Sequence, residues 1–272
     1  MAKPTVSILQ WLDGAADAAR RARLDPRDAD ALHDFRINVR RAIVHVKIGA
    51  KPRGVPAKLR KRLRRALRAT GPWRDAHIES IWMKHYARRR SSGPGAAALE
   101  RAVAQVRALA PADPHWWREV DRALMKARRA FEKGVSTKID LRAARLKAAE
   151  KEWRRLARRL RRLNDASGRR ALHKARIAVK KLRYILEAFR IAPRGLPDPA
   201  ALRELQTSLG DVHDRDVIAG DIAAIEPTAE LASPRRIALT RLARERRSLL
   251  LRAKRDWNAL LRLAPQRPAT KS

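Results

Sequence analysis

The sequence contains no cysteine among its 272 residues. Disulfide cross-links, thiol nucleophiles and zinc sites built on thiolates are therefore excluded. The sequence also lacks any run of about 18 apolar residues that could span a bilayer, and its N-terminus lacks the apolar core and small-residue cleavage site of a signal peptide. These absences predict a soluble, cytoplasmic protein that has no membrane partner.

Acidic and aromatic residues are scarce. There are 28 Asp and Glu against 65 Lys and Arg, so the formal net charge is +37, and the isoelectric point is about 11.8. Few soluble folds carry such an excess of one charge unless a polyanion neutralises it. Aromatic residues are only 4% of the chain, which is little material for stacking on nucleic-acid bases. The seven tryptophans are interpreted first as core residues at helix interfaces.

The residues that do dominate the sequence are alanine, leucine and arginine, and these, like the lysines set among them, have high intrinsic helix propensities. Apolar residues recur at four-residue steps, as at Leu59, Leu63 and Leu67, and no sustained two-residue alternation indicates a strand. The sequence therefore predicts an all-α protein. Breaks between its helix-length segments are expected at stretches that contain proline or glycine, namely residues 25–26, 51–56, 71–72, 91–95, 111–114, 134, 193–199 and 227.

The sequence repeats itself at a distance of 140 residues. The segment LHDFRINVRR at 32–41 returns as LHKARIAVKK at 172–181, and a weaker pair, Gly71–Asp75 and Gly210–Asp214, follows at an offset of 139. Two matches in the same order and at nearly the same spacing indicate an ancestral duplication with its junction at Gly134. We therefore expect two helical repeats, residues 1–134 and 135–272, each with about four helices that bury their apolar faces as a bundle.

The repeated segment carries its cations beside its apolar stripe, not opposite to it. If residues 32–48 and 172–188 are helices, each places its apolar residues on an arc of roughly 80° and its cations on the adjoining arc. Such a row can point into a groove between helices, where Arg offers forked donors to phosphate oxygens and Lys a compact charge. The alternative interpretation is a solvated helix face. The two rows are His33, Arg36, Arg40 and Lys47 in the first copy and His173, Arg176, Lys180 and Arg183 in the second.

The paired segments resemble the signature helices of the CHAD family, the conserved histidine α-helical domain. The family pattern places His, then Arg, then paired Arg or Lys on one helix of each half. Leu172–Tyr184 fits this pattern closely, and Leu205–Val217 resembles the helix that follows it. The resemblance spans nearly the whole chain and implies two pseudo-symmetric four-helix bundles around a basic central cleft or pore that binds inorganic polyphosphate. It adds the paired cations and a tyrosine to the candidate binding residues, namely Arg41, Lys181 and Tyr184.

The first copy departs from this pattern at two positions. Ile43 stands where the second copy has Arg183, and His77 stands where the second copy has Asp216. The two halves are therefore expected to contribute unequally to the site. Cations on the next predicted helix are further candidate phosphate contacts, although a solvated face is an equally good interpretation of each one. These cations are Arg60, Lys61, Arg64 and Arg65.

A short acidic stretch suggests a hard-metal or two-carboxylate centre. It contains Asp211, His213, Asp214 and Asp216, but its spacing lacks the glycine and terminal glutamate of a calcium loop. We interpret Asp211 and its neighbours as the cap of a helix that begins after Gly210, and the sequence leaves metal binding by the three aspartates open. No P-loop, zinc-protease or serine-hydrolase motif is present. We therefore expect neither a metal nor another cofactor.

The sequence as a whole predicts a non-enzymatic protein that binds inorganic polyphosphate through its rows of cations, with association with polyphosphate granules as an expected consequence. Two alternatives stay open. A nucleic-acid-binding protein would explain the charge equally well, although no recognised DNA or RNA motif is present. An enzyme that acts on polyphosphate or a nucleotide would need a nucleophile or a metal-holding carboxylate cluster, for which only the Asp211 group is available. The oligomeric state does not follow from the sequence.

Overall fold

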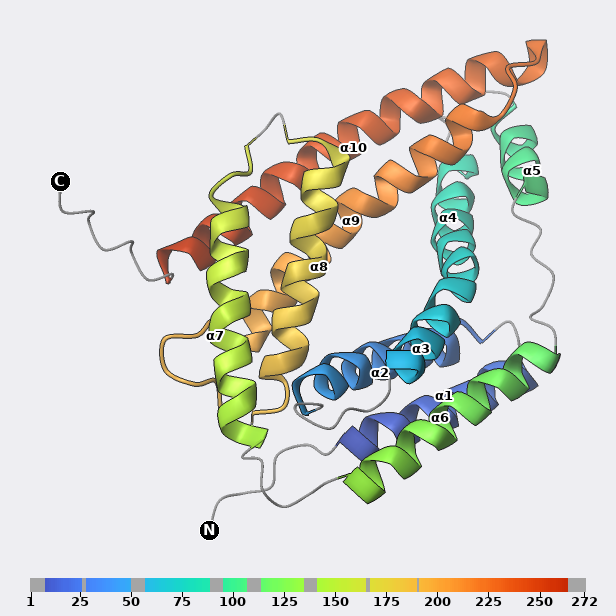
Figure 1. Ribbon diagram of the computed structural model, residues 1–272. Helices are drawn as coiled ribbons and strands as arrows, with labels where there is room; N and C mark the ends of the chain where they lie inside the picture. Colours follow the sequence, from blue (N-terminus) through green and yellow to red (C-terminus); the bar gives the residue numbers. More distant parts are fainter. Residues whose placement is uncertain are drawn as a thin grey trace. The chain divides into compact units, whose positions relative to one another are not determined.

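The computed structural model describes residues 8–25, 28–49, 57–88, 95–106, 114–134, 141–164, 167–189 and 191–263. Within these ranges the chain forms ten α-helices and no strand (Figure 1), so the all-α prediction is confirmed. The helices are α1 (Ile8–Leu24), α2 (Ala29–Gly49), α3 (Ala57–Ala69), α4 (Gly71–Ala87), α5 (Ala96–Val106), α6 (Pro114–Gly134), α7 (Leu141–Leu160), α8 (Arg169–Leu186), α9 (Pro199–Ala224) and α10 (Ala229–Arg262).

Most helices begin or end at the breaks that proline and glycine predict. Helices α6 and α9 begin at Pro114 and Pro199, where the missing N–H of proline needs no partner. Helix α6 ends at Gly134, the expected junction between the repeats. The break between α7 and α8 was not predicted. It contains a local turn in which the Ser167 hydroxyl accepts from the backbone N–H of Asn164 and donates to the side chain of the same residue.

The helices form two compact units. One unit contains α7, α8, α9 up to His213 and α10 from Arg246; the other contains α1 to α6, α9 from Asp214 and α10 up to Glu245. The units thus divide the chain differently from the two sequence repeats, because α9 and α10 each contribute to both units. The described part of residues 1–134 holds six helices, whereas the part from residue 135 onward holds four. The arrangement of two four-helix bundles around a central cleft stays a prediction.

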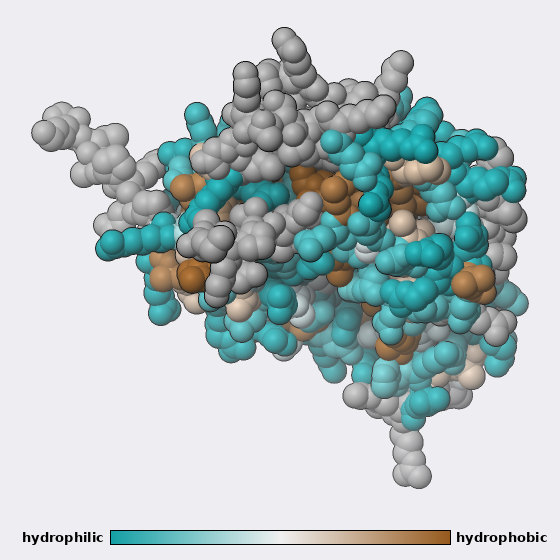
Figure 2. Space-filling model, turned by 90° about the horizontal axis from the view of Figure 1, so that it is seen from below, coloured by the Kyte–Doolittle hydropathy of each residue, from teal (hydrophilic) through white to brown (hydrophobic). Residues whose placement is uncertain are grey.

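Among the coloured residues of Figure 2, hydrophilic ones predominate, and apolar ones appear as separate patches. None of the helices in the described ranges has both the length and the apolar character needed to cross a membrane. The apolar residues are mainly inside. Of the tryptophans, Trp11, Trp82, Trp117, Trp153 and Trp257 are buried, which confirms their assignment to the core.

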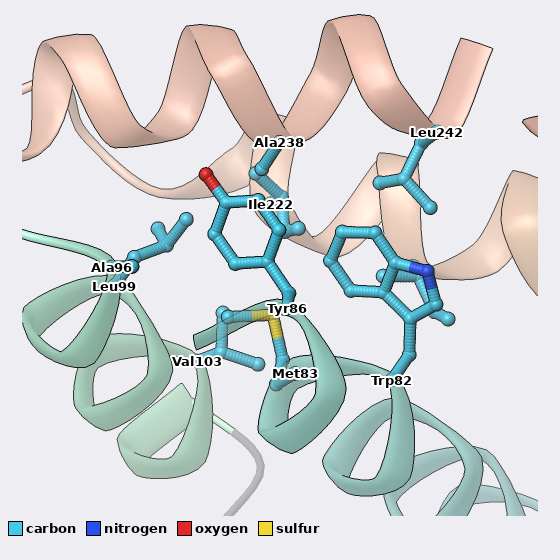
Figure 3. Close-up of a cluster of buried hydrophobic side chains, with 10 residues drawn as sticks. Trp82, Met83, Tyr86, Ala96, Leu99, Val103, Ile222, Ala238 and Leu242 are labelled. Atoms are coloured by element: carbon cyan, nitrogen blue, oxygen red, sulfur yellow. The ribbon is translucent and has the colours of Figure 1, made fainter. Parts of the chain in front are cut away.

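One well-defined core cluster joins α4 and α5 to the parts of α9 and α10 in the same unit (Figure 3). The rings of Trp82 and Tyr86 stack with their centroids 5.2 Å apart, and the Tyr86 hydroxyl donates to the backbone carbonyl of Pro234 over 2.9 Å. Pro234 lies inside α10, where its ring removes a backbone donor. The remaining cluster members are Met83, Ala96, Leu99, Val103, Ile218, Ile222, Ala238 and Leu242.

A carboxylate at the edge of this cluster is held by three donors. Glu245 accepts hydrogen bonds from Trp82 Nε1 at 3.0 Å and from Nε of Arg215 and Arg241, each at 2.9 Å. Burial raises the pKa of the Glu245 carboxyl, but these three hydrogen bonds outweigh burial, so the pKa lies below its ordinary value. The carboxylate therefore stays charged and ties α10 to both α4 and α9.

Substituting Gly95 with alanine is expected to destabilise this unit by about 2–3 kcal/mol. Gly95 has φ +84°, and a Cβ there would lie 3.1 Å from Cγ of Pro234 and 3.3 Å from the backbone oxygen of Glu230. Backbone strain and a close contact therefore act together. Gly195→Ala is the matched control, because Gly195 has φ +79° but open space around its Cβ position, so strain alone should cost about 1 kcal/mol. Urea unfolding followed by tryptophan fluorescence measures both, and equal losses would show that the contact with Pro234 contributes nothing.

Candidate polyanion-binding site

Helices α2 and α8 carry the two copies of the repeated segment. Helix α2 contains all of residues 32–48, whereas α8 ends two residues before the predicted limit of 188. In both copies the residues of the apolar arc whose side chains the structure describes are buried. In α2 these are Leu32, Phe35, Val39 and Ala42, and in α8 they are Leu172, Ala175, Val179, Leu182 and Leu186. The predicted core-facing stripe of each helix is therefore confirmed, and the position of the cations beside that stripe follows from helical geometry.

In the second copy, an exposed histidine and two half-buried cations follow one another along α8. The ring centroid of His173 lies 5.2 Å from that of His213 on α9, and Arg176 and Lys180 follow at the next two turns of α8. Partial burial lowers the pKa of His173, and the charges of Arg176 and Lys180 lower it further. A Cβ on Gly210 of α9 would lie 3.9 Å from Nε of Arg176. The guanidinium of Arg176 therefore lies beside the backbone of α9 at Gly210.

Two other predicted residues of the second copy, Arg183 and Tyr184, are buried inside the unit. Arg183 is only 5% exposed; its Nη1 pairs with Glu187 at 2.5 Å, and its Nε donates to Oε1 of Gln206 at 2.9 Å. Tyr184 is buried as well, with the Arg183 guanidinium 4.8 Å from the centre of its ring. Arg183 thus joins α8 to α9, and the first copy cannot form this contact because it has isoleucine at the matched position.

Lys181 contacts α7, whereas His173 and Arg176 of the row lie beside α9. It pairs with Glu152 on α7, which also pairs with Arg155 at a distance of 3.0 Å. Its ammonium group is therefore partly neutralised by a carboxylate of the same unit. The family resemblance added Lys181 to the candidate residues, but the sequence gave no sign of this partner.

In the first copy, the predicted arginine nearest to the histidine is buried. Arg36 is 7% exposed, and its Nη1 donates to the backbone oxygen of Leu67 at 2.9 Å and to the Thr70 hydroxyl at 2.7 Å. These acceptors lie at the C-terminal end of α3, where backbone carbonyls lack helical partners. Arg36 therefore stabilises the junction of α3 and α4. The other predicted residues of α2 lie at the surface, with His33 and Lys47 exposed and Arg40 and Arg41 half-buried.

The surroundings of His33 and His173 correspond to each other. Partial burial lowers the pKa of His33, followed by the charge of Arg74; Asp34 acts in the opposite direction. Arg74 and His213 occupy matched positions in the second repeated motif, 139 residues apart. Each copy therefore sets the histidine of its first motif near the same position of its second motif. The sequence match predicted the equivalence of the motifs but not that these residues would be neighbours.

The matched glycines mark the place where the copies differ. Gly71 begins α4, directly after the break at Thr70, whereas α9 passes through Gly210 without interruption. The interpretation of Asp211 as a helix cap is therefore wrong. A glycine inside a helix costs only about 1 kcal/mol, and this cost does not end α9. Within the described residues, no group of three or more histidines and carboxylates is arranged to hold a metal ion.

The candidate cations of α3 lie on its outer side. Lys61, Arg64 and Arg65 are exposed and Arg60 is half-buried, while Leu63 and Ala66 of the same helix are buried. Their positions agree with a solvated face as well as with phosphate contacts. The two copies also differ at the position where the sequence departs from the pattern: His77 of the first copy is exposed, whereas the matched Asp216 of the second copy is buried.

Comparisons with known proteins show which family model matches this chain and which solved structures share its fold. The model of the CHAD domain family matches residues 8–223, and no curated protein matches the chain in sequence. The CHAD domain from the plant Ricinus communis is 21% identical, with a TM-score of 0.63 over 98% of this chain and 96% of that chain. PptA from Streptomyces chartreusis is 17% identical, with a TM-score of 0.60 over 94% of this chain and 100% of that chain. At these identities, the structural likeness shows a shared fold.

Proposed function

Because the chain belongs to the CHAD domain family, we propose that it binds inorganic polyphosphate without chemically changing it. The family as a whole is associated with polyphosphate. The observation that carries the proposal for this chain is the row of His173, Arg176 and Lys180 along one side of α8, with spacings of three and four residues. Those spacings bring the three side chains to the same side of the helix, so they can contact successive groups of a chain of phosphates.

A second row lies on α2 and contains His33, Arg40 and Lys47. The corresponding neighbours of His33 and His173 support the view that each of the two units carries its own row of phosphate contacts. Arg41 and the cations of α3, namely Arg60, Lys61 and Arg64, are proposed as additional contacts in the first copy.

The buried predicted residues have a different role in this proposal. Arg36 and Arg183 are positioning residues: Arg36 fixes the end of α3, and Arg183 joins α8 to α9. Tyr184 lies beneath Arg183 and supports it by packing. Lys181 contributes charge next to α8 while it is paired with Glu152. The direct contacts therefore come from a smaller set than the sequence pattern predicts.

The proposed affinity is mainly electrostatic. Each phosphate that pairs with a protein cation releases condensed counterions, so the binding constant falls as salt concentration rises. With about four contacts from the arginines and lysines of the two rows, the logarithm of the binding constant should fall with the logarithm of salt concentration with a slope of roughly −3, by analogy with single-stranded nucleic acids. The same chemistry would hold the protein on cytoplasmic polyphosphate granules.

A direct competition separates polyphosphate from nucleic acid. At about 0.15 M salt, long-chain polyphosphate is compared with structured RNA and duplex DNA as a competitor of a labelled polyphosphate probe. At the same phosphate concentration, polyphosphate should displace the probe at least about tenfold more effectively than either nucleic acid. The reason is that a thin, flexible polyanion can follow a row of cations without placing bases against a surface poor in aromatic residues. Tighter binding of RNA would favour the nucleic-acid alternative. Release of orthophosphate during incubation with magnesium would contradict the non-catalytic role.

A further inference from the structure

A second group of cations lies on α7, outside the rows on α2 and α8. Arg155, Arg158, Arg159 and Arg162 surround an open pocket of about 340 Å³ at the C-terminal end of this helix. All four side chains are exposed. The spacing of Arg155, Arg158 and Arg159 places them on one side of the helix, and Arg162 lies in the turn directly after it. Leu156 and Leu160 on the other side of the helix are buried. The core contacts of α7 therefore hold this arginine face toward the solvent.

Few acceptors serve these guanidinium groups. Arg155 pairs with Glu152 at 3.0 Å, but Glu152 is shared with Lys181. Arg159 has only a long contact of 3.4 Å to the backbone oxygen of Lys174. In the part of the chain that the structure describes, no carboxylate pairs with Arg158, Arg159 or Arg162. The pocket therefore keeps a strong excess of positive charge.

The lining of the pocket defines the chemistry of its ligand. A concave surface with charges of one sign concentrates the electrostatic potential and attracts the opposite charge. Guanidinium forks match the oxygens of phosphate groups and can bind two of them at once. The volume lies in the range of sites for small ligands, but no apolar side chain lines the pocket. We propose that the α7 arginine pocket is a second phosphoanion site, which holds a short chain of phosphate groups.

This pocket is separate from the row proposed above. On α8, Lys174 and Lys181 contact residues of α7, whereas His173 and Arg176 approach His213 and Gly210 of α9. Adjacent positions differ by about 100° around a helix, so the two sets lie on different sides of α8, and α7 and α8 are drawn side by side in Figure 1. The inference therefore goes beyond the proposed function and does not require the α8 row to bind polyphosphate.

Calorimetric titration of the full chain with inorganic tripolyphosphate at about 0.15 M salt tests the proposal. The variant R158Q/R162Q should bind one equivalent of tripolyphosphate fewer, because its affinity at the pocket should fall at least about tenfold. A tenfold loss corresponds to about one hydrogen bond to a charged group. R158K/R162K keeps the charge but loses the fork, so its affinity should be intermediate. The control R252Q/R255Q removes the same charge from two exposed arginines of α10 in the same unit and should retain that equivalent. Circular dichroism verifies that each variant is folded.

Two results would overturn the inference. The first is an equal loss in R252Q/R255Q, because binding would then depend on overall charge. The second is the loss of the same single equivalent in R158Q/R162Q and in R176Q/K180Q, because the pocket and the α8 row would then be one site. If R176Q/K180Q retains full affinity for long-chain polyphosphate, the proposed function of the α8 row fails while the pocket is unaffected.

A further comparison identifies the source of the phosphate groups. Tripolyphosphate bound to the pocket is challenged with long-chain polyphosphate at matched phosphate concentration, in the R176Q/K180Q background. Displacement assigns the pocket to internal segments of long chains. Persistence of bound tripolyphosphate assigns it to free short chains, since long chains supply few ends at that concentration.

Discussion

Replacing both Arg176 and Lys180 with glutamate is expected to weaken the binding of long-chain polyphosphate by at least about 100-fold. The substitutions remove two phosphate donors and place two carboxylates beside His173, where the proposal requires phosphate groups to lie. The measurement is a binding isotherm with labelled polyphosphate at fixed salt concentration. Because Arg176 is half-buried beside α9, part of its stem packs against apolar surface. The milder variant R176Q/K180Q should show a smaller loss in the same direction with less effect on folding.

The matched control is R252E/R255E, which makes the same change in net charge on α10. Both arginines are exposed and belong to the same unit as α8. Charges outside the binding site are screened by salt beyond about 8–10 Å, so this variant should lose less than about threefold. If the two charge-reversal variants lose equal affinity while both remain folded, polyphosphate binds diffusely over the surface and the α8 row is not its site.

The fold could be predicted to a large extent from helix propensity and from proline and glycine. Pro114, Pro199 and Gly134 lie at helix ends because each suits a terminal position better than an interior one. Gly210 misled the prediction of a helix start, and Pro234 was not among the expected breaks. Gly210 lies inside α9, and Pro234 lies inside α10. Both are adjacent to groups from other helices, Arg176 and Tyr86 respectively. Such packing between segments distant in sequence overrides a local preference and leaves no mark in either segment alone.

The sequence predicted on which side of each helix the candidate residues lie, but not how deeply they are buried. Helical periodicity gives the angle of a side chain around its helix, so it correctly placed His173 and Lys180 beside the apolar stripe. It does not show whether a neighbouring helix packs against that side and buries the side chain. Arg36 is buried because the end of α3 offers it two acceptors, and Arg183 is buried because α9 brings Gln206 against it. Those acceptors belong to other helices.

The α7 arginine pocket shows a different limit of the sequence pattern. Its four arginines stand in a segment where arginine fills every surface position around Leu156 and Leu160, so the sequence resembles an ordinary solvated helix face. What distinguishes them is the concave surface they form and the shortage of carboxylates around it. Both properties depend on the conformations and neighbours of the side chains, which composition and periodicity do not describe.

The affinity for polyphosphate is expected to rise as the pH falls from about 8 to about 6, by at least about tenfold. In the free protein, partial burial together with nearby cations lowers the pKa of both His33 and His173 below the ordinary 6.5, so both rings are mainly neutral at pH 7. Bound phosphates bring negative charge to these rings and raise their pKa in the complex. The complex therefore holds more protons than the free protein in the pH window between the two pKa values.

The sign of the pH dependence follows from this difference in bound protons. Binding that takes up protons strengthens as pH falls, by up to about tenfold per pH unit for each histidine that becomes protonated. The increase should level off below the pKa of the free histidines, since both states are then protonated. Above the pKa in the complex the affinity should be low and constant, because neither state gains a proton. Long chains are needed for the measurement, because terminal phosphates themselves titrate near pH 6.

The variant H33Q/H173Q separates the histidines from other titrating groups. It should bind polyphosphate at pH 8 with nearly the affinity of the original chain, because the rings it replaces are neutral there, and its affinity should change little down to pH 6. His213 lies 5.2 Å from His173 between the ring centroids and is kept in this variant, so any pH dependence that survives can be tested by adding His213→Gln. Calorimetry in buffers with different ionisation enthalpies counts the protons taken up on binding. If the original chain and H33Q/H173Q take up equal numbers of protons, the phosphate groups do not reach His33 or His173, and the rows of cations must bind through their arginines and lysines alone.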